Sequence, residues 1–348
     1  MPELIFDAGT AYDFFVSLSV LNNPARFGLR PKWAAGVRSR LAPAQRSVLA
    51  QAAQVGPLPL YWLSQLQAAE KDSTAVLAAL RALEPNQILP ALYFTPDMPD
   101  PVRQILRDVQ QGARPSPREM DVLKADLLRI NRPAPARVIE TMLSAWARSA
   151  EYGEAYLDAL ETYANNFFLE EEQRLTPLIR KGQSHARDLA EQMDFVGLIE
   201  ELTQGLHIEA LQQVERVVLA PSFWSNPLIF YWLNAPRQAV LLFGFRPHTQ
   251  QLVPGESVPE STLNVLKALA DPTRLKILRY LGEEPQTPTQ LAQRLRLRPP
   301  TVIHHLNALR VAGLVHIDVQ AEGERRYALR RGALAVTWEN LNHYLHDQ

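Results

Sequence analysis

Residues 261–348 carry the pattern that most restricts what this chain can fold into. Four short segments with apolar residues at helical spacing end at Gly313, and two strand-like runs follow at 314–319 and 325–329. A final amphipathic segment runs from about 333 to 345. Three helices, a short turn, a fourth helix and a two-stranded hairpin predict a winged helix-turn-helix, whose fourth helix is stiff enough to enter the major groove of DNA.

The apolar spacing also predicts which side chains of these four helices are buried. They are Leu263, Leu266 and Ala270 in the first helix, Leu275, Leu278 and Leu281 in the second, Leu291, Ala292 and Leu295 in the third, and Val302, Leu306 and Leu309 in the fourth. With Val302 at the centre of the buried side, steps of 100° per residue leave one face of the fourth helix turned outward. That face holds Pro300, Thr301, His304, Asn307 and Val311.

The N-terminal end of a recognition helix does most of the base reading, so Thr301 and His304 are predicted to contact base edges. Arg298, just before the helix, suits a phosphate or a guanine. Strand alternation lets only one of the two hairpin arginines face DNA. For His305, beside the buried stripe, a structural role and a phosphate contact both stay open. The predicted DNA-binding set is Arg298, Pro300, Thr301, His304, His305, Asn307, Arg325 and Arg326.

Charge is distributed unevenly along the chain. Residues 261–348 hold 12 lysines and arginines against 8 acids, whereas the other 260 residues hold 24 against 29. A small basic module attached to a larger acidic body indicates one part that binds nucleic acid and another with a different role.

Two stretches of this region resemble the ArsR-type bacterial repressors. The stretch 268–278 is similar to the opening signature of that family, and 300–315 is similar to its recognition helix. The resemblance covers about a quarter of the chain. It implies a homodimeric repressor that binds an inverted-repeat operator in double-stranded DNA and releases it on sensing an effector. It further implies dimer contacts through the first and last helices, here 262–270 and 333–346.

The sequence departs from that family at its sensing and reading positions. The stretch 290–294 lacks the cysteine pair with which many members bind metals, and the whole chain has no cysteine. Only His343 and His346 are left on the last helix, so we expect neither a metal site nor a cofactor. Arg298 replaces a frequent serine at the helix N-cap and Ile303 another inside the helix, which predicts a different base preference.

The first 245 residues are predicted to form a large helical domain for sensing or oligomerisation, ending in a small antiparallel β-sheet. Helical segments are expected near 9–22, 31–41, 43–54, 72–83, 99–111, 116–130 and, in two or three longer helices, 136–193. Short β-branched and aromatic runs at 215–221, 228–232 and 239–245 predict the strands, the last two as a hairpin. A linker rich in proline is expected at 246–260. This region resembles, through residues 4–7, 12–15, 27–30 and 33–36, the long N-terminal domain of uncharacterised ArsR-like regulators.

Three side-chain groups of the N-terminal region admit competing interpretations. Glu170, Glu171 and Glu172 are expected to form a solvated helix face, because three consecutive acids point around a helix. Many aromatic residues allow either ordinary core packing or a pocket for an apolar effector. A basic cluster predicts either solvated helix faces or a site for an anion or additional DNA; it consists of Arg26, Arg30, Lys32, Arg38 and Arg40.

These patterns favour a cytoplasmic, sequence-specific DNA-binding transcriptional regulator that is not an enzyme. No Gly-x-Gly-x-x-Gly, Walker, Gly-x-Ser-x-Gly or His-Glu-x-x-His motif is present. No apolar run is long enough for a membrane helix, and the acidic start does not fit a signal peptide. The alternative is an enzyme of unknown type at the N-terminus, with the winged helix as a regulatory or protein-interaction appendage.

Overall fold

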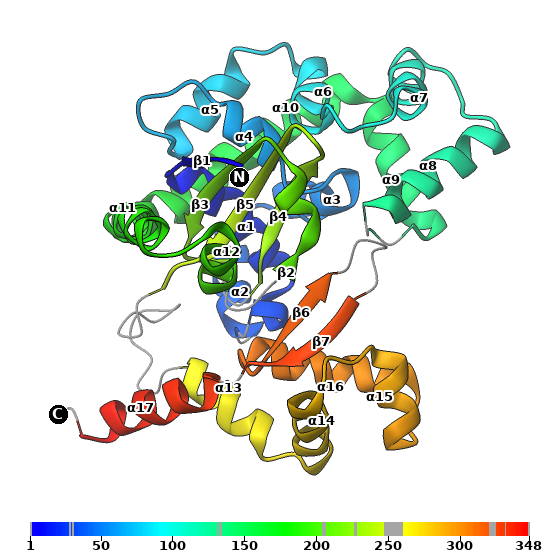
Figure 1. Cartoon of the computed structure of the whole chain (residues 1–348). Helices are drawn as coiled ribbons and strands as arrows, with labels where there is room; N and C mark the ends of the chain where they lie inside the picture. Colours follow the sequence, from blue (N-terminus) through cyan, green and yellow to red (C-terminus); the bar gives the residue numbers. More distant parts are fainter. Residues whose placement is uncertain are drawn as a thin grey trace. The chain divides into compact units, whose positions relative to one another are not determined.

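The computed structural model describes residues 2–27, 29, 31–130, 132, 134–203, 207–225, 228–246, 260–319, 325–330 and 332–346 (Figure 1). The chain divides into two compact units. One joins residues 1–8, 23–34 and 178–348, and the other joins 9–22 and 35–177. Helices dominate the chain, as predicted, and none in the described ranges is long and apolar enough to cross a membrane. The domain boundaries at 245 and 261 stay a prediction, and 247–259 of the expected linker lie outside the described residues.

The unit formed by 9–22 and 35–177 consists of helices and loops in its described part. Its helices are α1 (Thr10–Asn22), α3 (Pro43–Val55), α4 (Leu60–Gln65), α5 (Ser73–Arg81), α6 (Ile88–Tyr93), α7 (Asp100–Gln110), α8 (Pro117–Arg129), α9 (Ala136–Ala147) and α10 (Ser149–Tyr163), with a 3₁₀ turn at Pro85–Gln87 and a π-helical turn at Ala164–Phe168. Helices α2 (Pro31–Arg38) and α11 (Leu169–Gln192) continue from one unit into the other. The helical segments predicted from the apolar spacing are therefore confirmed.

Glu172 contradicts the expectation of a solvated acidic face. Its side chain is only 8% exposed. Its Oε1 accepts hydrogen bonds from Thr10 Oγ1 at 2.6 Å and from the backbone N–H of Ser73 at 2.8 Å, and its Oε2 accepts one from Ser73 Oγ at 2.6 Å. Thr10 and Ser73 are the first residues of α1 and α5, whose free N–H groups attract a carboxylate. Glu172 thus ties two helix starts to α11.

The other unit contains a mixed β-sheet, where the sequence predicted an antiparallel one. The strands β1 (Glu3–Phe6), β3 (Arg216–Ser222), β5 (Gln238–Gly244) and β4 (Phe230–Asn234) lie in that order. The predicted hairpin of β4 and β5 is confirmed, but β3 pairs with β1 and with β5 in parallel. The strand β1 was missed, because a run of four residues at the chain start carries too short a pattern to identify.

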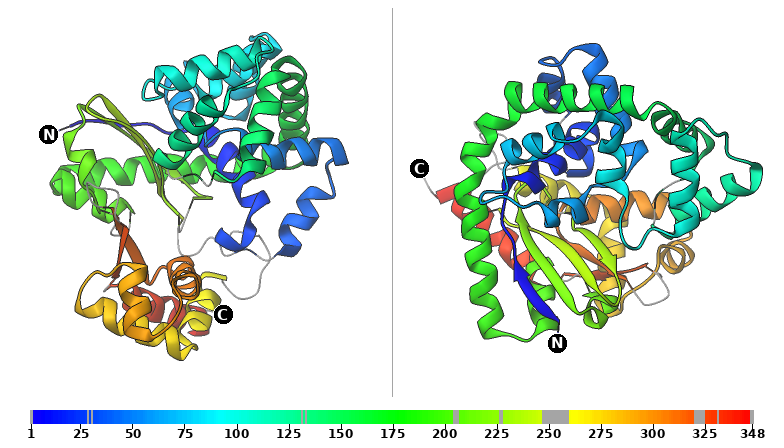
Figure 2. Two further views of the ribbon diagram at one scale, coloured as in Figure 1. Left: turned by 90° about the vertical axis from the view of Figure 1, so that its right-hand side faces the viewer. Right: turned by 90° about the horizontal axis from the view of Figure 1, so that it is seen from above.

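Helices α11 and α12 (Phe195–Thr203) cover one face of this sheet (Figure 2). The core between them includes Ala186, Leu198, Leu219 and Leu241. Helix α11 approaches closely at Gly182, where a Cβ atom would lie 2.8 Å from side-chain atoms of both Phe245 and Pro221. Only glycine fits this crossing without a shift of its neighbours.

Residues 260–346 form the predicted helices and hairpin in the predicted order. They are α13 (Glu260–Leu269), α14 (Pro272–Glu283), α15 (Pro288–Leu295), α16 (Pro299–Val311), β6 (Val315–Val319), β7 (Arg325–Leu329) and α17 (Ala333–His346). A two-residue strand β2 (His207–Ile208) pairs in parallel with β6, so the hairpin belongs to a three-stranded sheet of order β2-β6-β7. The tip of the hairpin, 320–324, lies outside the described residues.

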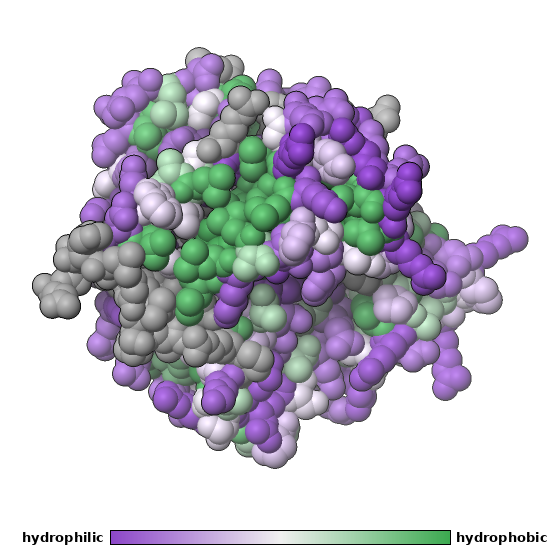
Figure 3. All heavy atoms as spheres, turned by 90° about the horizontal axis from the view of Figure 1, so that it is seen from below, coloured by the Kyte–Doolittle hydropathy of each residue, from purple (hydrophilic) through white to green (hydrophobic). Residues whose placement is uncertain are grey.

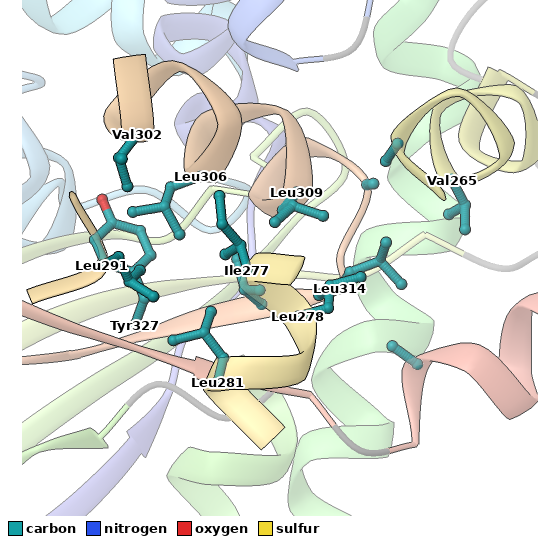
Figure 4. Close-up of a cluster of buried hydrophobic side chains, with 14 of the residues drawn as sticks. Val265, Ile277, Leu278, Leu281, Leu291, Val302, Leu306, Leu309, Leu314 and Tyr327 are labelled. Atoms are coloured by element: carbon teal, nitrogen blue, oxygen red, sulfur yellow. The ribbon is translucent and has the colours of Figure 1, made fainter. Parts of the chain in front are cut away.

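One hydrophobic core holds these helices and the hairpin together (Figure 4). The predicted stripe of α16 is confirmed, because Val302, Leu306 and Leu309 are fully buried. The predicted faces of the first two helices were partly wrong. In α13 the buried side chains are Thr262, Val265 and Ala268, so the face is rotated by one position from the prediction; in α14 Ile277 is buried with Leu278 and Leu281, while Leu275 is 48% exposed.

Candidate nucleic-acid interface

Local sequence signals fix the starts of two helices around the candidate site, α14 and α15. Asp271 caps α14 by accepting the backbone N–H of Arg274 at 2.9 Å, which is the main reason that its pKa lies below the ordinary value. Thr287 and Gln290 form a capping box at the start of α15. Proline follows each cap, where its missing N–H costs nothing. These caps define where α14 and α15 begin beneath the recognition helix.

The turn between α15 and α16 depends on Arg296. This residue adopts the left-handed conformation, with φ of 55° and ψ of 42°, at the C-cap of α15. The chain then turns into α16, whose N-cap is Arg298, as predicted. Its far end is closed by Gly313 at φ of 68°, again as predicted, and Leu314 N donates to Leu309 O at 3.0 Å.

The outward face of α16 is polar at its N-terminal end. Arg298, Pro300, Thr301, His304 and Asn307 are all exposed, opposite the buried stripe of the same helix. Their contact with DNA stays a prediction, but the structure brings them onto one accessible surface. A helix that buries one side and presents short polar side chains on the other suits insertion into the major groove.

His305 lies on the flank of α16 and is half-buried. Its Nδ1 is 3.9 Å from Asp271 Oδ1, and its ring lies edge-on to His304 with 5.9 Å between ring centroids. The distance to Asp271 fits an ion pair only when the imidazole is protonated. Both interpretations of His305, structural and phosphate-binding, are compatible with this position.

The two hairpin arginines differ in exposure, and which of them faces DNA stays a prediction. Arg325 is exposed, Arg326 is half-buried, and Tyr327 is buried. Tyr327 also exchanges two backbone hydrogen bonds with Gln286, of 2.8 and 2.9 Å, which fix the hairpin to the loop before α15. Arg325 is therefore the hairpin arginine whose side chain is more accessible to DNA.

Two residues of α16 that the set above omits also bear on the interface. Ile303 is 41% exposed, so an apolar side chain lies on the accessible side of α16. Arg310 lies near the helix end with its Nε buried and without a hydrogen-bond partner. The apolar periodicity could have predicted that Ile303 is exposed, since this residue falls outside the buried stripe. Nothing in the local sequence indicates the surroundings of Arg310.

Comparison with known proteins identifies this part of the chain. A family model described as bacterial regulatory protein, arsR family, matches residues 271–316. These residues are an ArsR-family helix-turn-helix domain. The ArsR-family domain makes this part of the chain a DNA-binding transcriptional regulator domain, and no family is assigned to the N-terminal region.

The relatives of the ArsR-family domain are regulators from archaea and bacteria. Two uncharacterized HTH-type transcriptional regulators of Methanocaldococcus jannaschii are 42% identical over 59 residues and 40% identical over 57, which is 17% and 16% of this chain. The transcriptional repressor SdpR of Bacillus subtilis is 40% identical over 52 residues, or 15% of this chain. The chain covers 62%, 64% and 58% of the lengths of these three proteins.

One solved structure is also similar, an ArsR-like transcriptional regulator from Rhodococcus sp. RHA1. It is 36% identical, and the match covers 24% of this chain and 77% of that protein with a TM-score of 0.22. All four matches span a quarter of the chain or less. The predicted likeness of the N-terminal region to that of uncharacterised ArsR-like regulators stays a prediction.

Metal sites and effector pockets can be assessed in the described part of the chain. Among the described residues no three His, Asp or Glu side chains lie close enough together to hold a metal ion. The side chains of His343 and His346 lie outside them. A pocket of about 270 Å³ at the ends of α7 and α8 is lined by Ile105, Asp108, Val109, Gln111, Ala113, Arg114, Pro115 and Glu119. It contains no aromatic side chain, so it does not match the aromatic effector pocket considered from the sequence.

Proposed function

We propose that this protein is a sequence-specific transcriptional repressor that acts in the cytoplasm as a homodimer on an inverted-repeat operator. The observation that carries the proposal is the two-sided α16, with Val302, Leu306 and Leu309 buried and Thr301, His304 and Asn307 exposed. Two such helices related by a two-fold axis would enter successive major grooves.

Dimer formation is supported by apolar surface on the two helices that flank the ArsR-family domain, α13 before it and α17 after it. Leu266 of α13 is 43% exposed, and Leu334 and Trp338 of α17 are 46% and 65% exposed. Figure 3 views the molecule from below in Figure 1 and shows hydrophobic side chains gathered in a patch on that face. Exposed side chains of this size in neighbouring helices favour a second copy as the partner.

We further propose that the N-terminal region modulates operator binding through the hairpin. Strand β2 pairs with β6 in the register Ile208 to Val319, and Ile208 is buried in the core formed by α12 and the four-stranded sheet. Ile317 of β6 packs against the same core. A small-molecule effector that bound the N-terminal region better in one arrangement of β2 would change the position of the hairpin and hence the affinity for DNA.

The test is fluorescence anisotropy with DNA from upstream of the gene and a scrambled control, at several salt concentrations. The proposal expects tight binding that discriminates against the scrambled DNA. Thr301→Ala and His304→Ala should each reduce that discrimination, by a factor of about 5 to 150 if a base contact is lost. Wild-type protein that binds both DNAs equally, with no effect of either substitution, would contradict the proposal.

The oligomeric state is tested by light scattering after gel filtration. Leu266→Glu combined with Leu334→Glu should convert dimer to monomer, because charges placed at the interface lose their hydration there. Leu128→Glu, at a leucine of α8 that is 65% exposed, is the matched control and should leave the dimer intact. An unchanged mass for the double variant would refute this interface.

We assign no reaction to the N-terminal region, and the expectation that the chain is not an enzyme stays a prediction. The buried carboxylate of Glu172 accepts three hydrogen bonds from protein groups, which leaves it poorly suited to act as a general base. Turnover of a metabolite by the purified full chain would instead favour the alternative in which an enzyme carries a winged-helix appendage.

A further inference from the structure

Three arginines from distant parts of the sequence come together at the C-terminal end of the recognition helix. A short 3₁₀ turn, η1 (Pro24–Phe27), packs against α16 within the unit that holds both. Arg26 of this turn and Arg325 of the hairpin both act electrostatically on Arg310 of α16. Burial is the main cause that lowers the pKa of Arg310; Tyr327 opposes this effect, and the nearby charges of Arg26 and Arg325 add smaller contributions that lower it.

The 3₁₀ turn is anchored so that Arg26 stays at this place. Phe27 is 4% exposed and its ring stacks on that of Phe230 in β4, with 6.2 Å between centroids. Backbone hydrogen bonds from Arg26 N to Asn23 O and from Leu29 N to Pro24 O, each of 3.0 Å, close the turn. The side chain of Arg26 is exposed on this fixed support.

Neighbouring cations of like charge are costly unless an anion neutralises them. None of Arg26, Arg310 and Arg325 forms an ion pair with a residue in the described part of the chain, and Arg310 Nε is buried without a hydrogen-bond partner. Other members of the basic cluster are used differently: Arg38 donates to Leu21 O, and Arg40 donates to Asn166 O at 3.2 Å. Arg30 lies outside the described residues.

We propose that Arg26, Arg310 and Arg325 bind a phosphate of the DNA backbone, so that the N-terminal segment 23–27 is part of the DNA-binding surface. Arginine fits a phosphate because its planar fork donates two parallel hydrogen bonds. DNA supplies the phosphate, because Arg310 and Arg325 come from the recognition helix and the hairpin, the two elements that a winged helix applies to the duplex. This inference rests on the proposed function, and it explains why an acidic N-terminal region keeps an exposed arginine beside α16.

The test compares the full-length Arg26→Ala variant with wild type in the same anisotropy assay, on operator and on scrambled DNA. A lost phosphate contact should weaken binding to both DNAs by a similar factor and reduce the slope of log K against log salt by about 0.9. Between 50 and 200 mM salt, this difference in slope changes the ratio of wild-type affinity to variant affinity by about 3.5-fold. Arg46→Ala, at an exposed arginine of α3, is the matched control and should leave the slope unchanged.

The outcomes separate this inference from the proposed function. Discrimination by wild type, with an unchanged salt slope for Arg26→Ala, would overturn only the inference. Tighter DNA binding by Arg26→Ala would also overturn it, since the segment would then cover the surface instead of extending it. A further outcome is that inorganic phosphate stabilises wild type against heat but not Arg26→Ala, while both proteins bind DNA equally well. That result would assign the three arginines to a free anion and overturn the inference. Failure of wild type to discriminate between the two DNAs would contradict the proposed function itself.

Discussion

Removing the buried carboxylate of Glu172 should destabilise the helical unit more than any exposed acid can. Glu172→Ala deletes three hydrogen bonds to an ionised acceptor, donated by Thr10 Oγ1, Ser73 N and Ser73 Oγ. Each such bond contributes about 1.5 kcal/mol or more, and the backbone N–H of Ser73 is left buried without a partner. We therefore expect the free energy of unfolding to fall by about 4 kcal/mol or more, a large part of the 5–15 kcal/mol typical of a domain.

A graded series makes this expectation specific to the carboxylate. Glu172→Gln keeps the shape and one carbonyl acceptor for Thr10 and Ser73 N, and its new NH₂ group can donate to Ser73 Oγ. The expected loss is then only about 1–2 kcal/mol, the contribution of the charge. Glu170→Ala is the control, because Glu170 is exposed on the same helix and its loss should change stability by less than about 0.5 kcal/mol.

Differential scanning calorimetry of the full chain measures the series. A loss of about 4 kcal/mol in a unit of this size lowers the melting temperature by about 8–16 °C. Circular dichroism of the variants at low temperature shows whether the helices still form. If Glu172→Ala and Glu170→Ala melt within a degree of each other, the carboxylate does not hold α1 and α5 in place and the reasoning is wrong.

Two further perturbations follow from the ArsR-family domain. Burial lowers the pKa of His316 below its ordinary value; Arg330 adds to this effect, and Asp318 and Glu200 oppose it. Below about pH 6.5 the unfolded chain therefore binds more protons than the folded protein. The free energy of unfolding should then fall as the pH drops below this value and stay flat above it. Urea midpoints between pH 5 and 8 measure this, and His316→Gln should reduce the slope below pH 6.5; an identical slope in both proteins would assign it to other groups. Arg296→Gly should raise the free energy of unfolding by about 0.5–1 kcal/mol, because glycine adopts φ of 55° without strain. The control Arg279→Gly, at an exposed site inside α14, should lower it by about 1 kcal/mol, and a loss in both would show that Arg296 is not strained.

Most of the ArsR-family domain could be predicted from the sequence because its determinants are local. The caps at Asp271 and Thr287, the stripe of α16 and the termination at Gly313 each depend on residues within one or two helical turns. The error in α13 has a physical cause as well. Leu266 is apolar but exposed, so hydrophobic spacing alone placed it in the core, although the same leucine suits an interface between copies.

The N-terminal region was less predictable because its decisive contacts join residues far apart in the sequence. The parallel pairing of β1 with β3 brings Phe6 beside Leu219, and Glu172 meets Thr10 across 162 positions. In neither contact does the sequence around one partner indicate the other. A four-residue strand and a glutamate within an acidic run are each ambiguous by themselves.

The same long-range contacts connect the two parts of the proposed regulator. Strand β2 follows α12 along the chain, pairs with β6 of the hairpin, and buries Ile208 in the core beneath the sheet. The 3₁₀ turn with Arg26 packs against α16, and its charge acts on Arg310 together with that of Arg325. Since the N-terminal region contacts the hairpin through β2 and the recognition helix through η1, a change in that region can alter phosphate contacts without moving the buried stripe of α16. Such coupling would change affinity for all DNA sequences more than it changes the choice among them, because phosphates position a protein and base edges specify its site.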